Sequence, residues 1–297
     1  MKNLPKIIVV LGQTASGKSE LAIRLAKKFN GEIVSVDSRQ VYKGMNIGTG
    51  KVTKKEMKGI PHHLLNVALP KRKFSVVQYR KLAIVAINKV LKKDKIPFLV
   101  GGTGFYIQAV VDGILIPEVK PNWKFRSDLN KLKTEELFDL LKKLDSQRAK
   151  TIERKNRRRL IRALEIVIKT KKPIPFLKKT LPQFKVLMIG LKKNPEELKK
   201  LIQKRLLKRL KRGMVAEVKK LRKTGLSWKR LEEFGLEYRF VSQYLQGKIK
   251  YDEMVQKIQK ESEHYAKRQM TWFKRDKRIN WLKTYKQAEK LVKKFLK

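Results

Sequence analysis

The segment Lys6–Ser19 reads KIIVVLGQTASGKS, and its pattern decides the class of fold. The first part, Lys6–Leu11, is a short apolar run rich in β-branched residues, which predicts a buried parallel strand. The second part, Gly12–Ser19, matches G-x-x-x-x-G-K-[ST], and apolar residues at helical spacing follow over Glu20–Phe29. Strand, loop and helix in this order predict a phosphate-binding loop, or P-loop.

A P-loop binds phosphate because backbone N–H groups of the loop and of the following helix point toward the anion. Lys18 adds a positive charge, and the hydroxyl of Ser19 is a candidate ligand for Mg²⁺. The candidate diphosphate-binding residues are Gly12, Gln13, Thr14, Ala15, Ser16, Gly17, Lys18 and Ser19. No Asp begins a D-x-x-G motif and no N-K-x-D motif occurs, so a GTPase is excluded.

Four further apolar runs predict strands, over residues 32–36, 97–100, 185–191 and 278–282. Helical patterns lie between them, including 76–91, 105–111 and a long block over 194–272, so we expect a P-loop NTPase-like α/β core with a parallel sheet. The run 97–100 ends in two glycines instead of an acid, which disfavours an ATPase motor. The charged helical stretch that starts at residue 114 interrupts this core. We expect a helical insertion domain over 114–150, and a catalytic core made of 1–113 plus 151–297.

The charge of the chain indicates a polyanionic partner. Lys+Arg number 75 against 26 Asp+Glu, which gives a net charge of +49. Much of the lysine excess can be solvated background, but five arginines cluster over Arg154–Arg162 and six more over Arg205–Arg239. Clustered arginine is typical of phosphate recognition, and a net charge of this size favours nucleic acid as a partner.

The chain has no cysteine, which excludes disulfides and cysteine-ligated zinc and fits a reducing compartment. No apolar run approaches 18 residues, and the start of the chain does not resemble a signal peptide. We therefore expect a cytoplasmic protein with no membrane partner.

Asp37 follows the second predicted strand directly. Active sites of parallel sheets gather outside the carboxyl ends of the strands, so Asp37 is expected beside the P-loop. There its carboxylate can hold Mg²⁺ or take a proton from an acceptor nucleophile. The alternative role is that of a helix N-cap. The polar and aromatic residues that follow, over 38–42, suit contacts to a base or a sugar–phosphate.

Seven sequence blocks occur in the order found in tRNA dimethylallyltransferases, and the chain resembles that family over about residues 6–275. The blocks are GQTASGKS (12–19), VDSRQVY (36–42), IGTGK (47–51), PHHL (61–64), GGTGFY (101–106), RRLIRALE (158–165) and YAKRQMTWF (265–273). The resemblance implies transfer of a dimethylallyl group from dimethylallyl diphosphate to N6 of the adenine 3′ of the anticodon in tRNA, with Mg²⁺. The P-loop would then hold a diphosphate leaving group instead of a nucleotide.

The resemblance also implies roles for individual residues. Asp37 would be the general base on the adenine amine, and Thr103 would lie near the reacting groups and the tRNA. One arginine of the helix after the fourth strand would meet the diphosphate, and Arg205 is our choice over Arg209, one turn further along. The residues that would contact tRNA are Asp37, Ser38, Arg39, Gln40, Thr103, Lys124 (or Arg126), Arg158, Arg159 and Arg162. The insertion would close on the anticodon stem of the tRNA, and the enzyme is expected to be a monomer.

Purely structural roles are the alternative for some of these residues. The arginines of 158–162 can form a solvated helix end, and Thr103 can be a helix N-cap. His62 and His63 are expected to order a loop rather than bind metal, and Trp272 and Phe273 are expected to be buried rather than to stack on bases. Two other functions stay open from the residues alone: transfer of the same group to AMP, or a small-molecule kinase. A non-catalytic RNA-binding protein is a third class, which Asp37 beside an intact P-loop disfavours.

Overall fold

A computed structural model of the chain describes residues 4–114, 119, 121–174 and 182–297. The chain forms two compact units: the first combines Met1–Gly113 with Pro182–Lys297, and the second comprises Ile114–Leu181.

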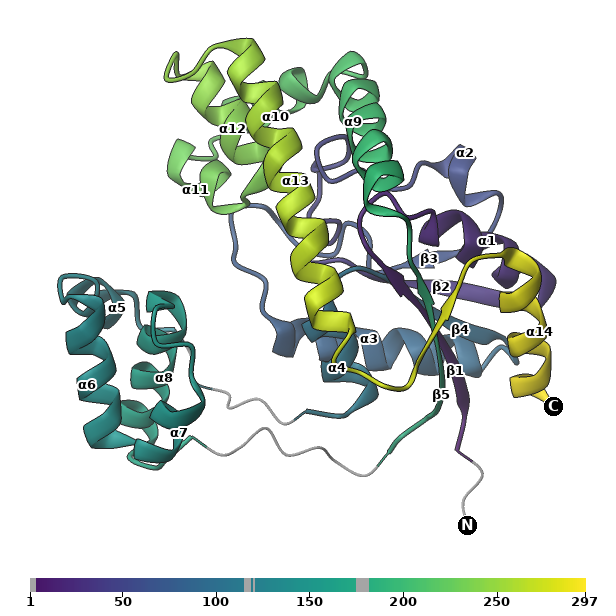
Figure 1. The fold of residues 1–297 in the computed structure, drawn as a ribbon, viewed down its shortest axis with the longest axis horizontal. Coiled ribbons are helices and arrows are strands. Elements are labelled where there is room, and N and C mark those ends of the chain that lie inside the picture. Colours follow the sequence, from purple (N-terminus) through teal and green to yellow (C-terminus); the bar gives the residue numbers. More distant parts are fainter. Residues whose placement is uncertain (1–3, 115–118, 120, 175–181) are drawn as a thin grey trace. The chain divides into compact units, whose positions relative to one another are not determined.

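The first unit is built on a parallel sheet (Figure 1). Its strands among the described residues are β1 (Lys6–Gly12), β2 (Gly31–Val36), β3 (His62–His63), β4 (Ile96–Gly101), β5 (Lys185–Leu191) and β6 (Ile279–Leu282), in the spatial order β3-β2-β4-β1-β5-β6. The five predicted strands are confirmed. β3 was not predicted, because two histidines carry no strand pattern and only their pairing with Ile33 and Val34 of β2 makes them a strand.

Ten helices of the first unit lie within the described residues. They are α1 (Lys18–Lys28), α2 (Lys54–Met57), α3 (Val76–Leu91), α4 (Gly104–Val111), α9 (Pro195–Lys211), α10 (Met214–Lys223), α11 (Trp228–Glu233), α12 (Leu236–Leu245), α13 (Tyr251–Phe273) and α14 (Tyr285–Leu296). Local signals fix many of their ends. Ser75 caps α3 in a capping box with Gln78, and Asn194 caps α9 ahead of a proline at the first helical position.

The side chains of β1 alternate between two hydrophobic cores, as the period of a strand requires. Ile7, Val9 and Leu11 join the core that contains residues of α3, α4 and α9–α13. Ile8 and Val10 join the core that α1 and α14 cover from the other face. All five side chains are fully buried, and each contributes about 1.5–3 kcal/mol to folding. Helices on both faces explain why β1 reads as a continuous apolar run.

The helices α9–α13 gather around the end of the sheet at which β1 finishes (Figure 1). This is the carboxyl end of the strands, where the loops that carry the sequence motifs also lie. The predicted helical block 194–272 is therefore the structure that surrounds the site.

The second unit has a hydrophobic core of its own. Its described helices are α5 (Trp123–Leu129), α6 (Thr134–Leu144), α7 (Ser146–Thr151) and α8 (Arg157–Thr170). Leu137 and Leu141 of α6 pack with Leu160 and Leu164 of α8, and all four side chains are fully buried. The unit therefore runs past residue 150, the boundary we expected. The first turn of α8 is rich in arginine, but the rest of the helix has an apolar face that packs in this unit rather than in the α/β core.

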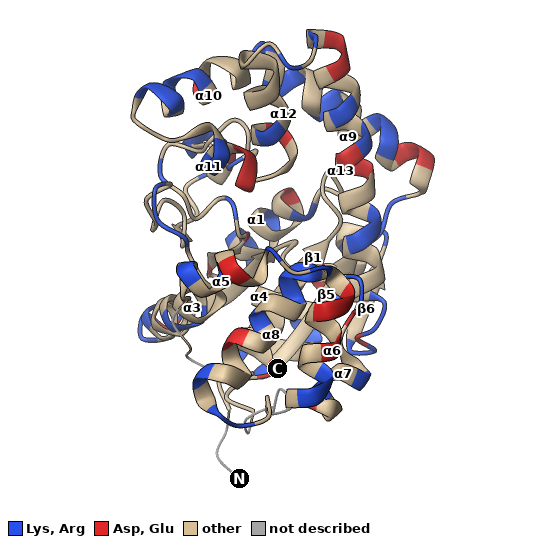
Figure 2. Ribbon diagram, turned by 90° about the vertical axis from the view of Figure 1, so that its left-hand side faces the viewer, with Lys and Arg blue, Asp and Glu red and all other residues tan. Residues whose placement is uncertain are grey.

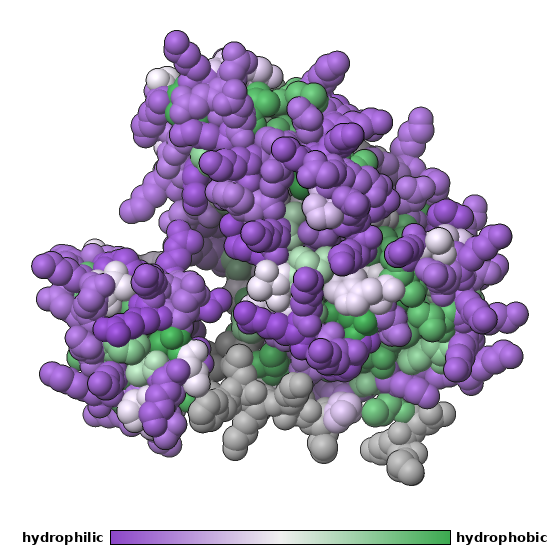
Figure 3. Space-filling view, viewed as in Figure 1, coloured by the Kyte–Doolittle hydropathy of each residue, from purple (hydrophilic) through white to green (hydrophobic). Residues whose placement is uncertain are grey.

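Charge is spread over both units instead of being confined to one element. Figure 2 shows lysine and arginine on nearly every helix in view, with fewer acids between them. The face drawn in Figure 3 is largely hydrophilic. Over the described residues, the structure contains no helix that is both long enough and apolar enough to cross a membrane.

Candidate active site

The P-loop connects β1 to α1 at the carboxyl end of the central strand, as predicted. A Cβ atom on Gly12 would lie 2.7 Å from the carbonyl oxygen of Leu191, so only glycine fits there. Gly17 has φ of 89° and is the N-cap residue of α1, and no side chain caps this helix. The first amides of α1 are therefore available to an anion.

Lys18 is half-buried in the loop, and its Nζ donates a hydrogen bond to the carbonyl oxygen of Gln13 at 3.0 Å. Loss of hydration and, after it, the nearby charge of Arg205 together lower the pKa of Lys18 to about 8, against the opposing effect of the Asp37 carboxylate. The negative charge near the ammonium group thus does not offset the effects that favour loss of its proton. A bound anion would supply that charge and keep the proton on Lys18.

Two serines of the loop fit a phosphorylated ligand and a metal ion. The Oγ atom of Ser16 is buried and has no hydrogen-bond partner among the described residues. Ser19 lines both cavities that meet at the loop. The described part of the chain has no group of three or more acidic or histidine side chains suited to a metal. This donor set fits Mg²⁺ held by the Ser19 hydroxyl, phosphate oxygens and water, which is a common coordination for that ion.

Asp37 lies directly after β2 and faces the same cavity as Lys18 and Ser19. Its Oδ1 atom accepts hydrogen bonds from the backbone N–H groups of Arg39 at 2.8 Å and Gln40 at 3.2 Å. No helix begins here, so Asp37 orders a turn instead of capping a helix. The turn uses Oδ1, and within the described residues no hydrogen bond to Oδ2 occurs, so this oxygen is available for chemistry.

Thr103 is the N-cap residue of α4, but its hydroxyl does not cap the helix. Its Oγ1 atom instead accepts a hydrogen bond from the backbone N–H of Ser38 at 3.1 Å. The approach of the two chain segments is close, because a Cβ atom on Gly101 would lie 2.0 Å from the carbonyl oxygen of Val36. The motifs VDSRQVY and GGTGFY thus meet at Thr103, beside Asp37.

The two arginines of α9 have different environments. Arg205 donates to Thr14 Oγ1 of the P-loop at 3.2 Å and to the carbonyl oxygen of Gly50 at 3.1 Å. Arg209 donates to the carbonyl oxygen of Gly48 at 2.8 Å and pairs with Glu237 at 2.7 Å. Because Arg209 has a carboxylate partner and Arg205 contacts the P-loop itself, the geometry favours our choice of Arg205 for the diphosphate.

Sequence reasoning missed Gln269 of α13, which joins two motifs. Its Oε1 atom accepts a hydrogen bond from the backbone N–H of Thr14 at 2.8 Å, and its Nε2 donates to the carbonyl oxygen of Gly102 at 2.9 Å. A signal was present in the sequence. Gln269 lies in a buried stripe with Ala266 and Phe273 at helical spacing, and a buried amide in an apolar stripe needs polar partners.

Two cavities meet at the P-loop. The first has a volume of about 410 Å³, and its wall includes Asp37, Arg39, Tyr265 and Arg268. The second, of about 440 Å³, is lined on its other side by Lys51, Lys208, Arg212 and His62. The residues common to both walls are Ala15, Lys18, Ser19, Gln40, Val100, Arg205 and Arg209. The P-loop therefore borders both cavities, and of these two the first has Asp37 in its wall.

The two histidines lie in strand β3 instead of the loop that we expected, and of the two aromatic residues Phe273 is buried while Trp272 is partly buried. His63 Nε2 lies 2.7 Å from the carboxylate of Glu32, and His62 Nδ1 lies 2.8 Å from the carbonyl oxygen of Ile60. Phe273 is buried, and Trp272 packs on the core with its ring against Gly104.

The remaining residues proposed for tRNA lie in two places. Ser38, Arg39 and Gln40 line the first cavity with Asp37. Lys124 lies on α5 of the second unit, and the arginines at 158, 159 and 162 lie on α8.

The arginines of α8 are not equivalent. Arg158 is exposed, and Arg159 pairs with Glu153 at 3.1 Å. Arg162 is tied to the buried carboxylate of Glu165 at 2.5 Å, and Arg126 to the same carboxylate at 2.6 Å. Arg162 and Arg126 therefore help to hold the second unit together, whereas Arg158 is available to a partner.

The fold and the site define a P-loop protein of the α/β class that carries a carboxylate beside its phosphate loop. The model of the family described as "IPP transferase" matches residues 40–276. A tRNA dimethylallyltransferase of Carboxydothermus hydrogenoformans is 40% identical over 300 residues, covering 98% of this chain and 96% of that protein. The chain belongs to the IPP transferase family.

Solved structures agree with this assignment. The full-length tRNA isopentenylpyrophosphate transferase from Bacillus halodurans superimposes with a TM-score of 0.73 at 33% identity, covering 98% of this chain and 95% of that one. A eukaryotic dimethylallyltransferase acting on tRNA gives a TM-score of 0.76 at 29% identity, covering 90% of this chain and 69% of that one. The expected fold class is thereby confirmed.

Proposed function

We propose that this chain transfers a dimethylallyl group from dimethylallyl diphosphate to N6 of the adenine 3′ of the anticodon in tRNA, and that Mg²⁺ assists. Membership of the family gives the general reaction, a prenyl transfer to tRNA. The particular adenine and the residue roles are our proposal. The observation that carries them is that Asp37, with Oδ2 uncommitted, faces the same cavity as Lys18 and Ser19 of the P-loop.

The donor side of the reaction needs positive charge on the departing diphosphate. Lys18, the first amides of α1 and Arg205 surround the position that the P-loop reserves for an anion. Ser16 Oγ is a buried hydroxyl in need of a partner, which a phosphate oxygen would provide. When Mg²⁺ is bound at Ser19, it would neutralise part of the diphosphate charge. These groups stabilise the charge that grows on the leaving oxygen as its bond to carbon breaks.

The acceptor side needs a proton acceptor. The amine of adenine is a weak nucleophile, because its lone pair is delocalised into the ring. As the N6–C1 bond forms and the C1–O bond to the diphosphate breaks, Asp37 Oδ2 takes one N6 proton. Positioned proton transfer of this kind contributes about 10²–10⁴-fold to a rate. The turn that Oδ1 makes with Arg39 and Gln40 holds the carboxylate in place for this step.

The adenine must leave the base stack of the anticodon loop to reach Asp37, so we expect it to be flipped into the first cavity. That cavity has polar side chains from residues 38–40 and the ring of Tyr265 in its wall. Thr103 ties this segment to the loop after β4. On the second unit, Lys124 and the exposed Arg158 are the side chains that we assign to the tRNA backbone.

The test is a labelling assay with tRNA and AMP side by side. Labelled dimethylallyl diphosphate, Mg²⁺ and the protein are expected to label tRNA that has adenine 3′ of the anticodon. A matched tRNA with guanine at that position is the control and should stay unlabelled. Label on AMP alone, or equal label on the control tRNA, would contradict the proposal.

A further inference from the structure

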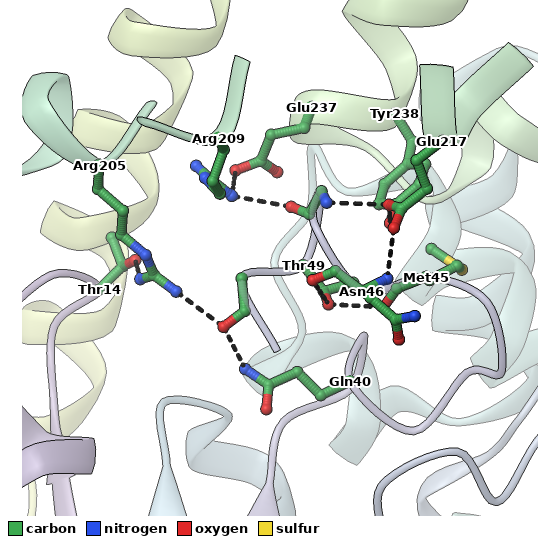
Figure 4. Close-up of polar contacts among 12 residues, drawn as sticks. Thr14, Gln40, Met45, Asn46, Thr49, Arg205, Arg209, Glu217, Glu237 and Tyr238 are labelled. Carbon is green, nitrogen blue, oxygen red and sulfur yellow. Dashed lines mark hydrogen bonds and ion pairs between the residues drawn. The ribbon is translucent and has the colours of Figure 1, made fainter. Parts of the chain in front are cut away.

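The loop Asn46–Lys51 contains the IGTGK motif and lies between Gln40 on one side and the arginines of α9 on the other (Figure 4). We call these six residues the glycine loop. It presents two backbone carbonyl oxygens to α9: the oxygen of Gly48 accepts from Arg209, and the oxygen of Gly50 accepts from Arg205. The oxygen of Gly50 also lies 3.4 Å from Nε2 of Gln40. The glycine loop thus sets the direction of two guanidinium groups at the site.

A single carboxylate holds the first half of this loop. Glu217 of α10 accepts hydrogen bonds from the backbone N–H groups of Asn46 at 2.8 Å and Ile47 at 2.7 Å through Oε2. Its Oε1 atom accepts from the N–H of Gly48 at 2.9 Å and from the hydroxyl of Tyr238 at 2.7 Å. Three consecutive backbone N–H groups around one anion form a nest, which here encloses a side chain of the protein itself.

The glycine loop packs tightly against its neighbours at both of its glycines. A Cβ atom on Gly48 would lie 2.7 Å from the ring of Tyr238, which is itself buried. On the other side of the site, a Cβ atom on Gly50 would lie 2.1 Å from Nη2 of Arg205. The contacts therefore run in an unbroken series from Glu217 through the glycine loop to Arg205, and from Arg205 to Thr14 of the P-loop.

We infer that Glu217 is a positioning residue for diphosphate binding, which acts by fixing the glycine loop that aims Arg205 at the P-loop. This inference rests on the proposed function, because it takes the P-loop ligand to be a diphosphate. Glu217 lines neither cavity itself, but it holds Gly48 and Tyr238, which stand in the wall of the first. Its effect on the ligand therefore passes through the glycine loop. Charge-assisted hydrogen bonds to backbone N–H groups are strong enough for that role.

The direct test is Glu217→Gln, which keeps the size of the side chain. An amide has one acceptor oxygen, so in either orientation its NH₂ group faces two of the four donors. Affinity for pyrophosphate in the presence of Mg²⁺, measured by calorimetry on the full chain, is expected to fall about tenfold. Affinity for tRNA is expected to stay within twofold. Glu253→Gln on α13, which removes the same charge from an exposed ion pair with Lys257, is the matched control and should change neither affinity.

A double-mutant cycle separates positioning from general destabilisation. Arg205→Gln is expected to weaken pyrophosphate binding in the wild-type chain but much less in the E217Q chain, because there the guanidinium is already misdirected. Gly50→Ala displaces the same guanidinium from the loop side without altering Glu217, and should give a similar loss of affinity. Thermal melting of each variant establishes that the binding is measured on folded protein.

Three results would overturn the inference: wild-type pyrophosphate affinity in E217Q or G50A, fully multiplicative losses in the double variant, or an equal loss of tRNA affinity. A wild-type chain that binds no pyrophosphate would instead contradict the proposed function. The two failures are therefore distinguishable.

Discussion

The affinity for dimethylallyl diphosphate is expected to fall as the pH rises through about 8, because Lys18 loses its proton there. Burial is the main cause of the lowered pKa of Lys18, followed by the charge of Arg205. Only the protonated side chain attracts the diphosphate. With a pKa of about 8, about nine in ten molecules carry the proton at pH 7 and about one in ten at pH 9, so the association constant should drop roughly tenfold.

The measurement is calorimetric titration of the free protein with dimethylallyl diphosphate between pH 6.5 and 9.5, with tRNA omitted. Phosphate groups lose their last proton near pH 6, so the ligand itself is fully ionised over most of this range. Titrations in buffers of different ionisation enthalpy should also reveal proton uptake on binding near pH 8. A limit of one proton is expected, and two would indicate that Lys51, whose pKa burial also lowers to about 8, takes part.

Two variants locate the titrating group. Lys18→Arg keeps a charge at every pH tested, so its affinity should be lower at neutral pH but flat toward high pH. Arg205→Gln removes a cation that lowers the pKa of Lys18, so the fall in affinity should move to higher pH even though binding is weaker throughout. An unchanged midpoint in the R205Q chain, or no fall below pH 9.5 in the wild type, would refute the reasoning.

Three further predictions test other parts of the structure. Asp37→Asn should lower turnover by about 10²-fold or more while leaving tRNA affinity intact, and normal single-turnover rates would rule out its role as base. Gln269→Leu removes the acceptor of the half-buried backbone N–H of Thr14, so diphosphate affinity should fall about tenfold in calorimetry. Unaltered affinity would show that the bridge is dispensable. Glu32→Gln should remove one source of the loss of stability in acid. Burial acts to raise the pKa of Glu32, but hydrogen bonds from His63 and two lysines outweigh it and lower the pKa to about 2. The folded-state value is below the unfolded one, so the stabilisation is complete above about pH 4.5 and is lost toward pH 2, and denaturation curves of E32Q should lack that dependence.

The parts of the fold that could be predicted are those whose signals are local. Lys6–Ser19 carries strand, turn and helix in one stretch, and Asp37 could be placed beside it because carboxyl ends of parallel strands share one edge of a sheet. β3 could not be predicted, because its two residues become a strand only through pairing with β2. The boundary at residue 150 was wrong for a related reason, since the apolar face of α8 finds its partners on α6.

Residues of the site that depend on long-range contacts could not be predicted either. Motif residues such as Lys18 were recognisable from spacing, but Glu217 and Gln269 were not. Glu217 stands in the first turn of a basic helix, where an acid usually serves the helix dipole, and its loop partners lie about 170 residues away in the sequence. Gln269 binds an amide 255 residues away. Such residues act through contacts that only the folded chain creates.

The position of β1 in the middle of the sheet affects when the site can form during translation. The strand is synthesised first, yet one of its two neighbours, β5, begins only at Lys185. Thr14 of its loop receives its partner Gln269 later still. During translation the nascent chain therefore carries a complete P-loop sequence without a complete site. Ribosome-bound chains that end before α13 should fail to retain pyrophosphate, and binding should begin once that helix has emerged.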